Sequence, residues 1–244
     1  MIVVYGDFTD ALSWVASMRV DALLQAEAAV EWRAVRAVRT TRVVAAPMGA
    51  DMARRVHDIR GWHHETALPG EPTGWGTPLM VPNAGPPVSA YAEAVEAGIP
   101  DHVRHLLFRS YWLDRLDIGN PDVLRHLLAV PFLHGSSRSE VISQHGYAVA
   151  IGGGPITTPA WWLARRWRHE WEQLGCPELP TVVDEDLTYK GLEAADHLGT
   201  LIEPHPDRAL ATAAANPFRL PPMPLAAQQR SITRPGLRAA WWDA

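Results

Sequence analysis

Two hydrophobic patterns follow one another in the first 35 residues of the chain. Residues 2–5 are a short run of β-branched and aromatic side chains, typical of a buried strand. Apolar residues then recur every three to four positions over 10–29, which predicts an amphipathic helix. Residues 30–35 alternate in the manner of a strand. A helix that joins two strands makes them parallel neighbours, so the pattern predicts a β-α-β unit.

The next part of the chain predicts a loop followed by helices. Residues 43–87 are rich in glycine and proline, which indicates a loop with at most one short helix, at 52–62. Helical spacing then returns in three stretches: 88–97, 99–116 and 121–133. Asp101 and Asn120 suit helix N-caps.

The last part of the sequence returns to strands. Thr158 and the proline after it predict a further helix, over 160–174. Two short β runs, 179–183 and 187–190, flank an acidic turn, and a final amphipathic helix begins at Gly191. Beyond residue 204 the chain is rich in proline and alanine and ends near two adjacent tryptophans, so we expect this tail to be extended and docked on the body or on a partner.

Composition narrows the possible chemistry. The 244 residues are 47% hydrophobic, enough for one large core, and the net charge is −5 with dispersed arginines, which does not suggest a nucleic-acid partner. A single cysteine, Cys176, excludes an internal disulfide, and we expect it to be structural. No signal sequence or membrane-length apolar run is evident, so we expect a cytoplasmic protein without a membrane partner.

The turn after the first strand carries the most informative motif. Residues 7–16 read D-F-T-D-A-L-S-W-V-A, which resembles a signature shared by DsbA-like oxidoreductases, kappa-class glutathione transferases and 2-hydroxychromene-2-carboxylate isomerase. Asp10 and Ser13 stand at the two cysteine positions of that signature. Three further stretches are similar to family elements: Pro82-Asn83-Ala84, residues 115–124, and Leu179-Pro180-Thr181, whose proline is cis in the family.

The resemblance implies an α/β protein with a thioredoxin-like fold and a large α-helical insertion domain. We expect residues 1–45 and 175–204 to form a split thioredoxin-like domain. Residues 46–174 would be a loop plus the helical insertion, and 205–244 the C-terminal tail. The family binds its substrate in the cleft between the two domains.

Three residues of the turn are candidate catalytic groups. Asp10 is either a helix N-cap alone or a cap that also faces a ligand; the helix dipole lowers the pKa of such an acid, whereas a dry pocket would raise it. Asp7 is the second candidate acid, with a surface turn residue as the alternative. Ser13 could hold a substrate oxygen or activate an external thiol, although a carboxylate at Asp10 would repel a thiolate.

The substrate-binding candidates come from the turn and from the family elements. They are Thr9, Trp14, Asn83, Trp112, Leu179 and Pro180. Core packing is the alternative for Trp14, and a simple turn residue is the alternative for Asn83. Trp62, Trp75 and Trp112 are candidates for an aromatic lining of the cleft.

Two other features suggest no chemistry. The histidine pairs His63-His64 and His102/His105 have no third ligand in zinc spacing, so we predict no metal site. Residues 152–154 are three glycines without the lysine of a phosphate loop, which favours a connector over a nucleotide cradle.

The favoured hypothesis is an enzyme that has lost disulfide chemistry and isomerises, dehydrates or cyclises a small aromatic or polyketide-like molecule, in specialised metabolism. It would require no cofactor. Two alternatives stay open: a redox-inert binding or scaffold protein, and a transferase or oxidoreductase that uses Ser13 with a low-molecular-weight thiol. A homodimer is compatible with the sequence.

Overall fold

A computed structural model describes residues 1–37, 45–175 and 178–202. The predictions for Cys176 and for the C-terminal tail lie outside these residues.

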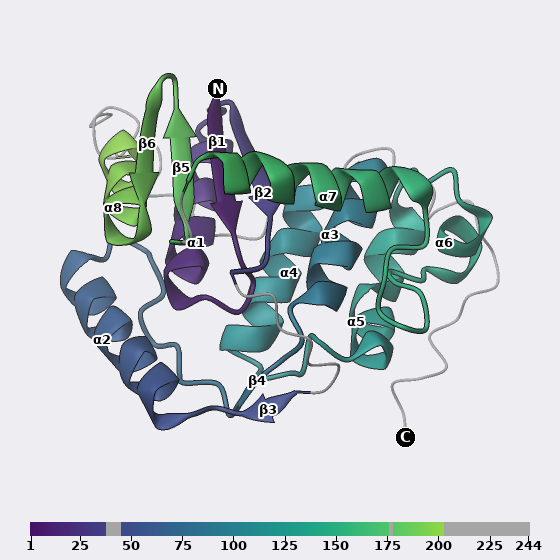
Figure 1. Ribbon diagram of the computed structural model, residues 1–244, viewed down its shortest axis with the longest axis horizontal. Helices are drawn as coiled ribbons and strands as arrows, with labels where there is room; N and C mark the ends of the chain where they lie inside the picture. The colour runs from purple at the N-terminus through teal and green to yellow at the C-terminus, as the bar shows by residue number, and fades with distance from the viewer. Residues whose placement is uncertain (38–44, 176–177, 203–244) are drawn as a thin grey trace.

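A four-stranded sheet holds the N-terminal and C-terminal segments together (Figure 1). Its order is β2-β1-β5-β6, formed by Val30–Ala34, Ile2–Gly6, Thr181–Asp184 and Leu187–Lys190. The strands β1 and β2 are parallel, as predicted, whereas β5 is antiparallel to β1 and β6 is antiparallel to β5. The sheet thus brings β5 directly beside the strand that leads into the turn at Asp7.

Two helices pack together against this sheet. α1 (Ala11–Gln25) follows β1 directly, and α8 (Gly191–Ile202) follows β6 and packs along α1. α1 is buried around most of its surface, including Val15 and Ala16, because it lies between the sheet, α8 and the helices of the middle of the chain. A helix enclosed in this way needs apolar residues on several faces.

The middle segment begins with more regular structure than the sequence predicted. β3 (Ala46–Pro47) pairs with β4 (Met80–Val81), and α2 covers Ala50–Thr66. The short helix predicted at 52–62 is therefore longer at both ends. Val56, Ile59 and His63 form its buried stripe, and the contacts of His63 described below fix its last turn.

Five further helices complete the middle segment. They are α3 (Gly85–Glu96), α4 (Pro100–Trp112), α5 (Pro121–His134), α6 (Glu140–His145) and α7 (Thr158–Gln173). In Figure 1, α7 runs across α3, and it also contacts β2. None of the helices in the described ranges is both long and apolar enough to cross a membrane.

The helix starts differ in part from the predictions. Asn120 caps α5 as predicted, and its side chain accepts a hydrogen bond from the Asp122 N–H. Asp101 lies inside the first turn of α4 instead of at its cap. The cap of α7 is Thr157, because the buried Glu93 carboxylate accepts hydrogen bonds from the N–H and the hydroxyl of Thr157.

A buried ion pair joins α4 to α1. Arg104 is fully buried and donates hydrogen bonds to the Asp21 carboxylate and to the carbonyl and hydroxyl of Ser17. His105 lies 2.9 Å from the same carboxylate. Apolar contacts continue across this junction, since the rings of Phe8 and Phe108 are 4.9 Å apart. The sheet and the inserted helices therefore share one hydrophobic core.

Candidate functional site

The turn between β1 and α1 places Asp10 at the first turn of a buried helix. Asp10 is the N-cap of α1, and its Oδ2 accepts hydrogen bonds from the backbone N–H and the hydroxyl of Ser13, each at 2.8 Å. No described residue donates a hydrogen bond to Oδ1. The helix therefore fixes one carboxylate oxygen, and the other has no hydrogen-bond donor among the described residues of this partly buried side chain.

Burial governs the acidity of Asp10. Desolvation raises its pKa from the usual 3.8 to about 6, although the hydrogen bonds from Ser13 and the charge of Arg55 act in the opposite direction. The nearby Asp7 adds to the increase. The helix N-terminus, which we expected to lower this pKa, is outweighed by the loss of solvent.

Ser13 is fully buried, and its hydroxyl is engaged on both sides. Its Oγ accepts a hydrogen bond from the Asp7 N–H at 3.2 Å and donates its hydrogen to Asp10. A serine has one hydroxyl hydrogen to donate. Ser13 therefore holds the carboxylate of Asp10 and offers no hydrogen to an external thiol in this arrangement.

Asp7 holds the shape of the turn. Its Oδ1 accepts hydrogen bonds from the N–H and the hydroxyl of Thr9, both at 2.8 Å, and its Oδ2 accepts one from the Ala37 N–H at 2.9 Å. Burial raises the pKa of Asp7 despite these bonds. The side chain is only 3% exposed, so Asp7 is not the surface acid of the alternative interpretation. Both oxygens and the Thr9 hydroxyl face protein groups.

Three of the four tryptophans considered for ligand contact belong to the core, whereas Trp62 is half-buried and packs against it. Trp14 and Trp112 are buried; Trp14 packs on Phe108, and the Trp112 indole donates a hydrogen bond to the Phe8 carbonyl at 3.2 Å. Trp75 is also buried and lies edge-on to Trp112, with the ring centroids 5.4 Å apart. These residues pack in the core next to the turn segment, which Trp112 contacts through Phe8, and sequence alone could not distinguish that role from ligand contact.

The Leu179–Pro180 peptide bond is cis, as the family element implied. Thr181 pairs with Tyr5 in the antiparallel register of β5 and β1. Pro180 thus precedes the strand residue opposite Tyr5, at the end of β1 from which the turn at Asp7 departs. Both Leu179 and Pro180 are buried, and the Pro180 carbonyl accepts a hydrogen bond from the Gly191 N–H at 2.8 Å.

Asn83 lines a cavity that none of the turn residues lines. Its Oδ1 accepts a hydrogen bond from the Gly85 N–H at 2.9 Å, so it shapes the start of α3. The cavity has a volume of about 380 Å³, and we call it the arginine cavity. Its lining also includes three arginines, a tryptophan and three glycines: Arg36, Arg165, Arg168, Trp161 and residues 152–154. Sequence patterns did not indicate this cavity, because Arg36 is far along the chain from Arg165 and Arg168.

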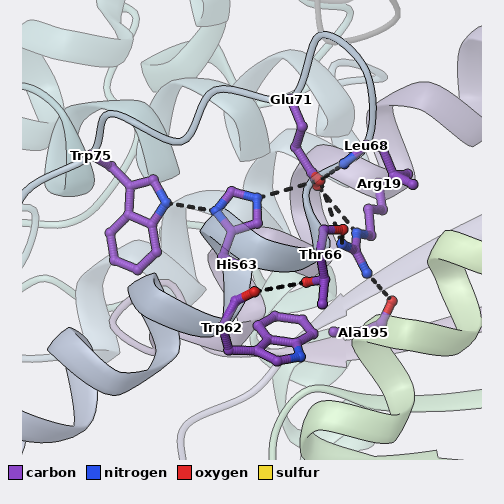
Figure 2. Close-up of polar contacts among 8 residues, drawn as sticks. All are labelled: Arg19, Trp62, His63, Thr66, Leu68, Glu71, Trp75 and Ala195. Atoms are coloured by element: carbon purple, nitrogen blue, oxygen red, sulfur yellow. Dashed lines mark hydrogen bonds and ion pairs between the residues drawn. The ribbon is translucent and has the colours of Figure 1, made fainter.

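A buried polar network anchors α2 and the following loop to α1 (Figure 2). Arg19 donates hydrogen bonds to the Glu71 carboxylate and to the Ala195 carbonyl, while His63 Nε2 lies 3.3 Å from Glu71 Oε2. On its other side, His63 Nδ1 accepts a hydrogen bond from the Trp75 indole at 3.0 Å. Because Nδ1 accepts, the neutral imidazole carries its hydrogen on Nε2, toward Glu71.

The network keeps Glu71 ionised. Burial alone would raise the pKa of Glu71, but the hydrogen bond from His63 and the charge of Arg19 together hold it below its usual value. This network was not predicted from the sequence, where His63 was considered only as a possible metal ligand. In the described ranges, no group of three or more His, Cys, Asp and Glu side chains is placed to hold a metal ion.

Comparison with known proteins identifies the fold. No family model and no curated protein matches this sequence. Among solved structures, the chain is similar to the cytosolic disulfide reductase DsbM from Pseudomonas aeruginosa, solved with GSH, with a TM-score of 0.55 and 20% identity over 87% of this chain and 98% of that one. It is also similar to 2-hydroxychromene-2-carboxylate isomerase, with a TM-score of 0.54 and 15% identity over 88% of this chain and 98% of that one.

Both neighbours are thioredoxin-fold proteins of the DsbA and kappa type. The chain therefore has the α/β, thioredoxin-like fold that the turn signature and the later elements predicted. At these identities the comparison establishes the fold alone.

Proposed function

We propose that the chain is an enzyme that isomerises, dehydrates or cyclises a small aromatic or polyketide-like molecule, with Asp10 as the acid/base group. The observation that carries this proposal is the raised pKa of Asp10 together with its one carboxylate oxygen that accepts no hydrogen bond from the described residues. Its pKa of about 6 lies near neutrality, and its Oδ1 accepts no hydrogen bond from the described residues. General acid/base catalysis is most efficient when the pKa of the catalytic group lies near the working pH.

In this mechanism Asp10 Oδ1 removes a proton from the substrate and returns it at another atom. The N–H and hydroxyl of Ser13 hold Oδ2, so the carboxylate keeps one orientation through both steps. Ser13 is thus a positioning residue. Asp7, the second candidate acid, orients the turn through Thr9 and Ala37 and is less suited to act as the base, because both its oxygens already accept hydrogen bonds. The reaction requires no metal or cofactor.

The structure gives less support to the thiol-dependent alternative. DsbM is named a disulfide reductase, but this chain has one cysteine in 244 residues and an aspartate at the first signature position. An ionised Asp10 would repel a thiolate, and Ser13 donates its hydroxyl hydrogen to that carboxylate. The other neighbour is named an isomerase, which agrees with the proposed reaction class.

Two measurements test the proposal. In the first, the Asp10 carboxyl carbon is followed by NMR over a pH titration; we expect a midpoint near 6, and a midpoint near 4, which is ordinary for a carboxylic acid, would contradict the base assignment. In the second, purified protein is incubated with 2-hydroxychromene-2-carboxylate, with and without glutathione.

The expected result is isomerisation without added thiol. Asp10→Asn should slow it by about 10²–10⁴, the usual contribution of a general base. Asp51→Asn is the control, because Asp51 is a fully exposed acid in the first turn of α2. A normal pKa together with no turnover would favour the binding or scaffold alternative, and turnover only with glutathione would favour the transferase.

A further inference from the structure

The arginine cavity has the dimensions of a small-molecule site. Its volume of about 380 Å³ is bounded by the end of β2, the start of α3, the glycine turn 152–154 and the middle of α7. Ligand pockets commonly measure roughly 300–1,000 Å³. None of Asp7, Asp10 and Ser13 lines it, so the cavity is distinct from the proposed catalytic turn, although the charge of Arg36 in its lining also acts on Asp7.

The charge of the lining is all of one sign. Arg36, Arg165 and Arg168 line the cavity, and no aspartate or glutamate does, although the whole chain has a net charge of −5. Arg168 also donates a hydrogen bond from Nε to Glu172 at 2.7 Å. A cavity whose charged lining residues are all cations raises the local concentration of anions.

Arg165 and Trp161 form one wall of the cavity. The guanidinium of Arg165 lies over the Trp161 ring, 4.6 Å from its centroid. Such stacking uses the flat face of the guanidinium and leaves its N–H edges available for hydrogen bonds. The indole is 41% exposed, so it also offers an apolar surface to a planar ligand.

Glycines keep the cavity open. A Cβ at Gly85 would lie 3.2 Å from Asn83 Oδ1, a tight approach, and 3.4 Å from Arg36 Nη1, at the limit of ordinary contact. Gly153 has φ +80° and packs against Pro86, where a Cβ would approach to 2.7 Å. The space beside Gly152 and Gly154 is empty within 4 Å. The turn is therefore fixed by its middle glycine and unobstructed at the other two.

We propose that the arginine cavity binds a small aromatic phosphate monoester, with the phosphate at the arginines and the ring against Trp161. A phosphate monoester carries about −1.5 to −2 charge at neutral pH and three acceptor oxygens, and it matches several guanidinium groups better than a single carboxylate does. The apolar residues between the arginines, among them Pro86 and Ala164, suit the ring.

Calorimetric titration of the full chain tests this binding with phenyl phosphate, benzoate and inorganic phosphate as probes. We expect saturable binding of phenyl phosphate, weaker binding of inorganic phosphate and the weakest binding of benzoate. No saturation by phenyl phosphate up to about 10 mM, well beyond the affinity of a specific site, would overturn the proposal. Benzoate binding as tightly as phenyl phosphate would overturn the phosphate assignment.

Matched variants locate the binding. Arg165→Ala should weaken phenyl phosphate binding at least about tenfold, the effect of losing one charge-assisted hydrogen bond. Arg166→Ala removes the same charge from the next position of α7, does not line the cavity, and should change the affinity less than about twofold. Equal losses in both variants would indicate attraction to overall charge and overturn the site.

Two more variants separate the parts of the proposal. Trp161→Ala should weaken phenyl phosphate binding more than inorganic phosphate binding; equal effects on the two probes would overturn the placement of the ring. Asp10→Asn should bind phenyl phosphate normally, because Asp10 does not line the cavity. Loss of binding in Asp10→Asn would contradict the separation of the two sites, whereas loss of turnover with intact binding concerns the catalytic proposal alone.

Discussion

The hydroxyl of Ser13 lies 2.8 Å from Oδ2 of Asp10 and donates its hydrogen to that carboxylate. Together with the backbone N–H of Ser13, it fixes the acid at the first turn of α1. The two positions that carry cysteines in the related signature thus carry a hydrogen-bonded pair here. The pair makes the acidity of Asp10 depend on Ser13.

Replacing Ser13 by alanine should raise the pKa of Asp10 above about 6, because the lost hydrogen bond lowers that pKa in the intact protein. The free energy of unfolding should fall by about 1–3 kcal/mol, since the buried Asp7 N–H loses its acceptor as well. NMR titration and urea denaturation measure the two effects. Ser143→Ala, at an exposed hydroxyl of α6, is the control and should change neither quantity. An unchanged Asp10 pKa in Ser13→Ala would contradict the coupling.

The stability of the protein should depend on the ionisation of Asp10. Between pH 3.8 and about 6, the folded chain retains a proton on Asp10 that the unfolded chain has lost, so this group makes the free energy of unfolding fall as the pH rises. Asp10→Asn removes that dependence and keeps a capping oxygen. The stability of Asp10→Asn relative to the native chain should therefore increase through this window and level off above it.

Denaturation curves at several pH values measure this difference directly. Asp7, whose pKa is also raised, is present in both proteins and largely cancels from the comparison. A relative stability that decreases toward pH 6 would show that Asp10 ionises more easily in the folded chain than in the unfolded one, contrary to the desolvation argument.

Glu71→Gln should destabilise the chain by about 3–5 kcal/mol, because it leaves the guanidinium of Arg19 buried without its negative partner. Hydrogen exchange should increase first in the last turn of α2, where Arg19 also bonds the Thr66 carbonyl. Asp51→Asn breaks a comparable pair with Arg54 on the surface of the same helix, and should leave the denaturation midpoint unchanged. Equal effects of the two substitutions would rule out a stabilising role for the buried network.

Purified protein should not reduce insulin disulfides or oxidise dithiols, because a catalytic cycle within one chain needs two thiols and the sequence has one, Cys176. A turbidity assay with dithiothreitol, with DsbM as the positive control, measures the reduction. Activity that persists in Cys176→Ser would require an external thiol and would revive the transferase alternative.

The sequence predicted the elements whose signals are local. The parallel strands predicted at 2–5 and 30–35 and the helix cap predicted at Asn120 are confirmed. Strand propensity and capping depend on residues that are close together in the sequence. The predicted helix ends were wrong where contacts with residues distant in the sequence determine where the helix begins or ends. Thr157 caps α7 in place of Thr158 because Glu93 holds it, and α2 continues to Thr66 in contact with Arg19 and Glu71.

The same distinction applies to the site. The motif identified Asp10, Ser13 and Asp7 as neighbours at one turn, and the hydrogen bonds join them there. The pKa of Asp10 could not be predicted, because it depends on burial by elements far along the chain. The arginine cavity was missed for the same reason: Arg36 and Arg165 are separated by more than half of the sequence.

The buried contact of Arg104 with Asp21 limits how this architecture can be modified. Excising the helical insertion would leave Asp21 in α1 without its guanidinium partner, and expressing the insertion alone would expose Arg104 and the aromatic ring of Phe108. We therefore expect that neither the helical insertion nor the thioredoxin-like part folds stably without the other. Chimeras with other proteins of this fold should exchange α1 and α4 together, because each helix carries half of one charge pair.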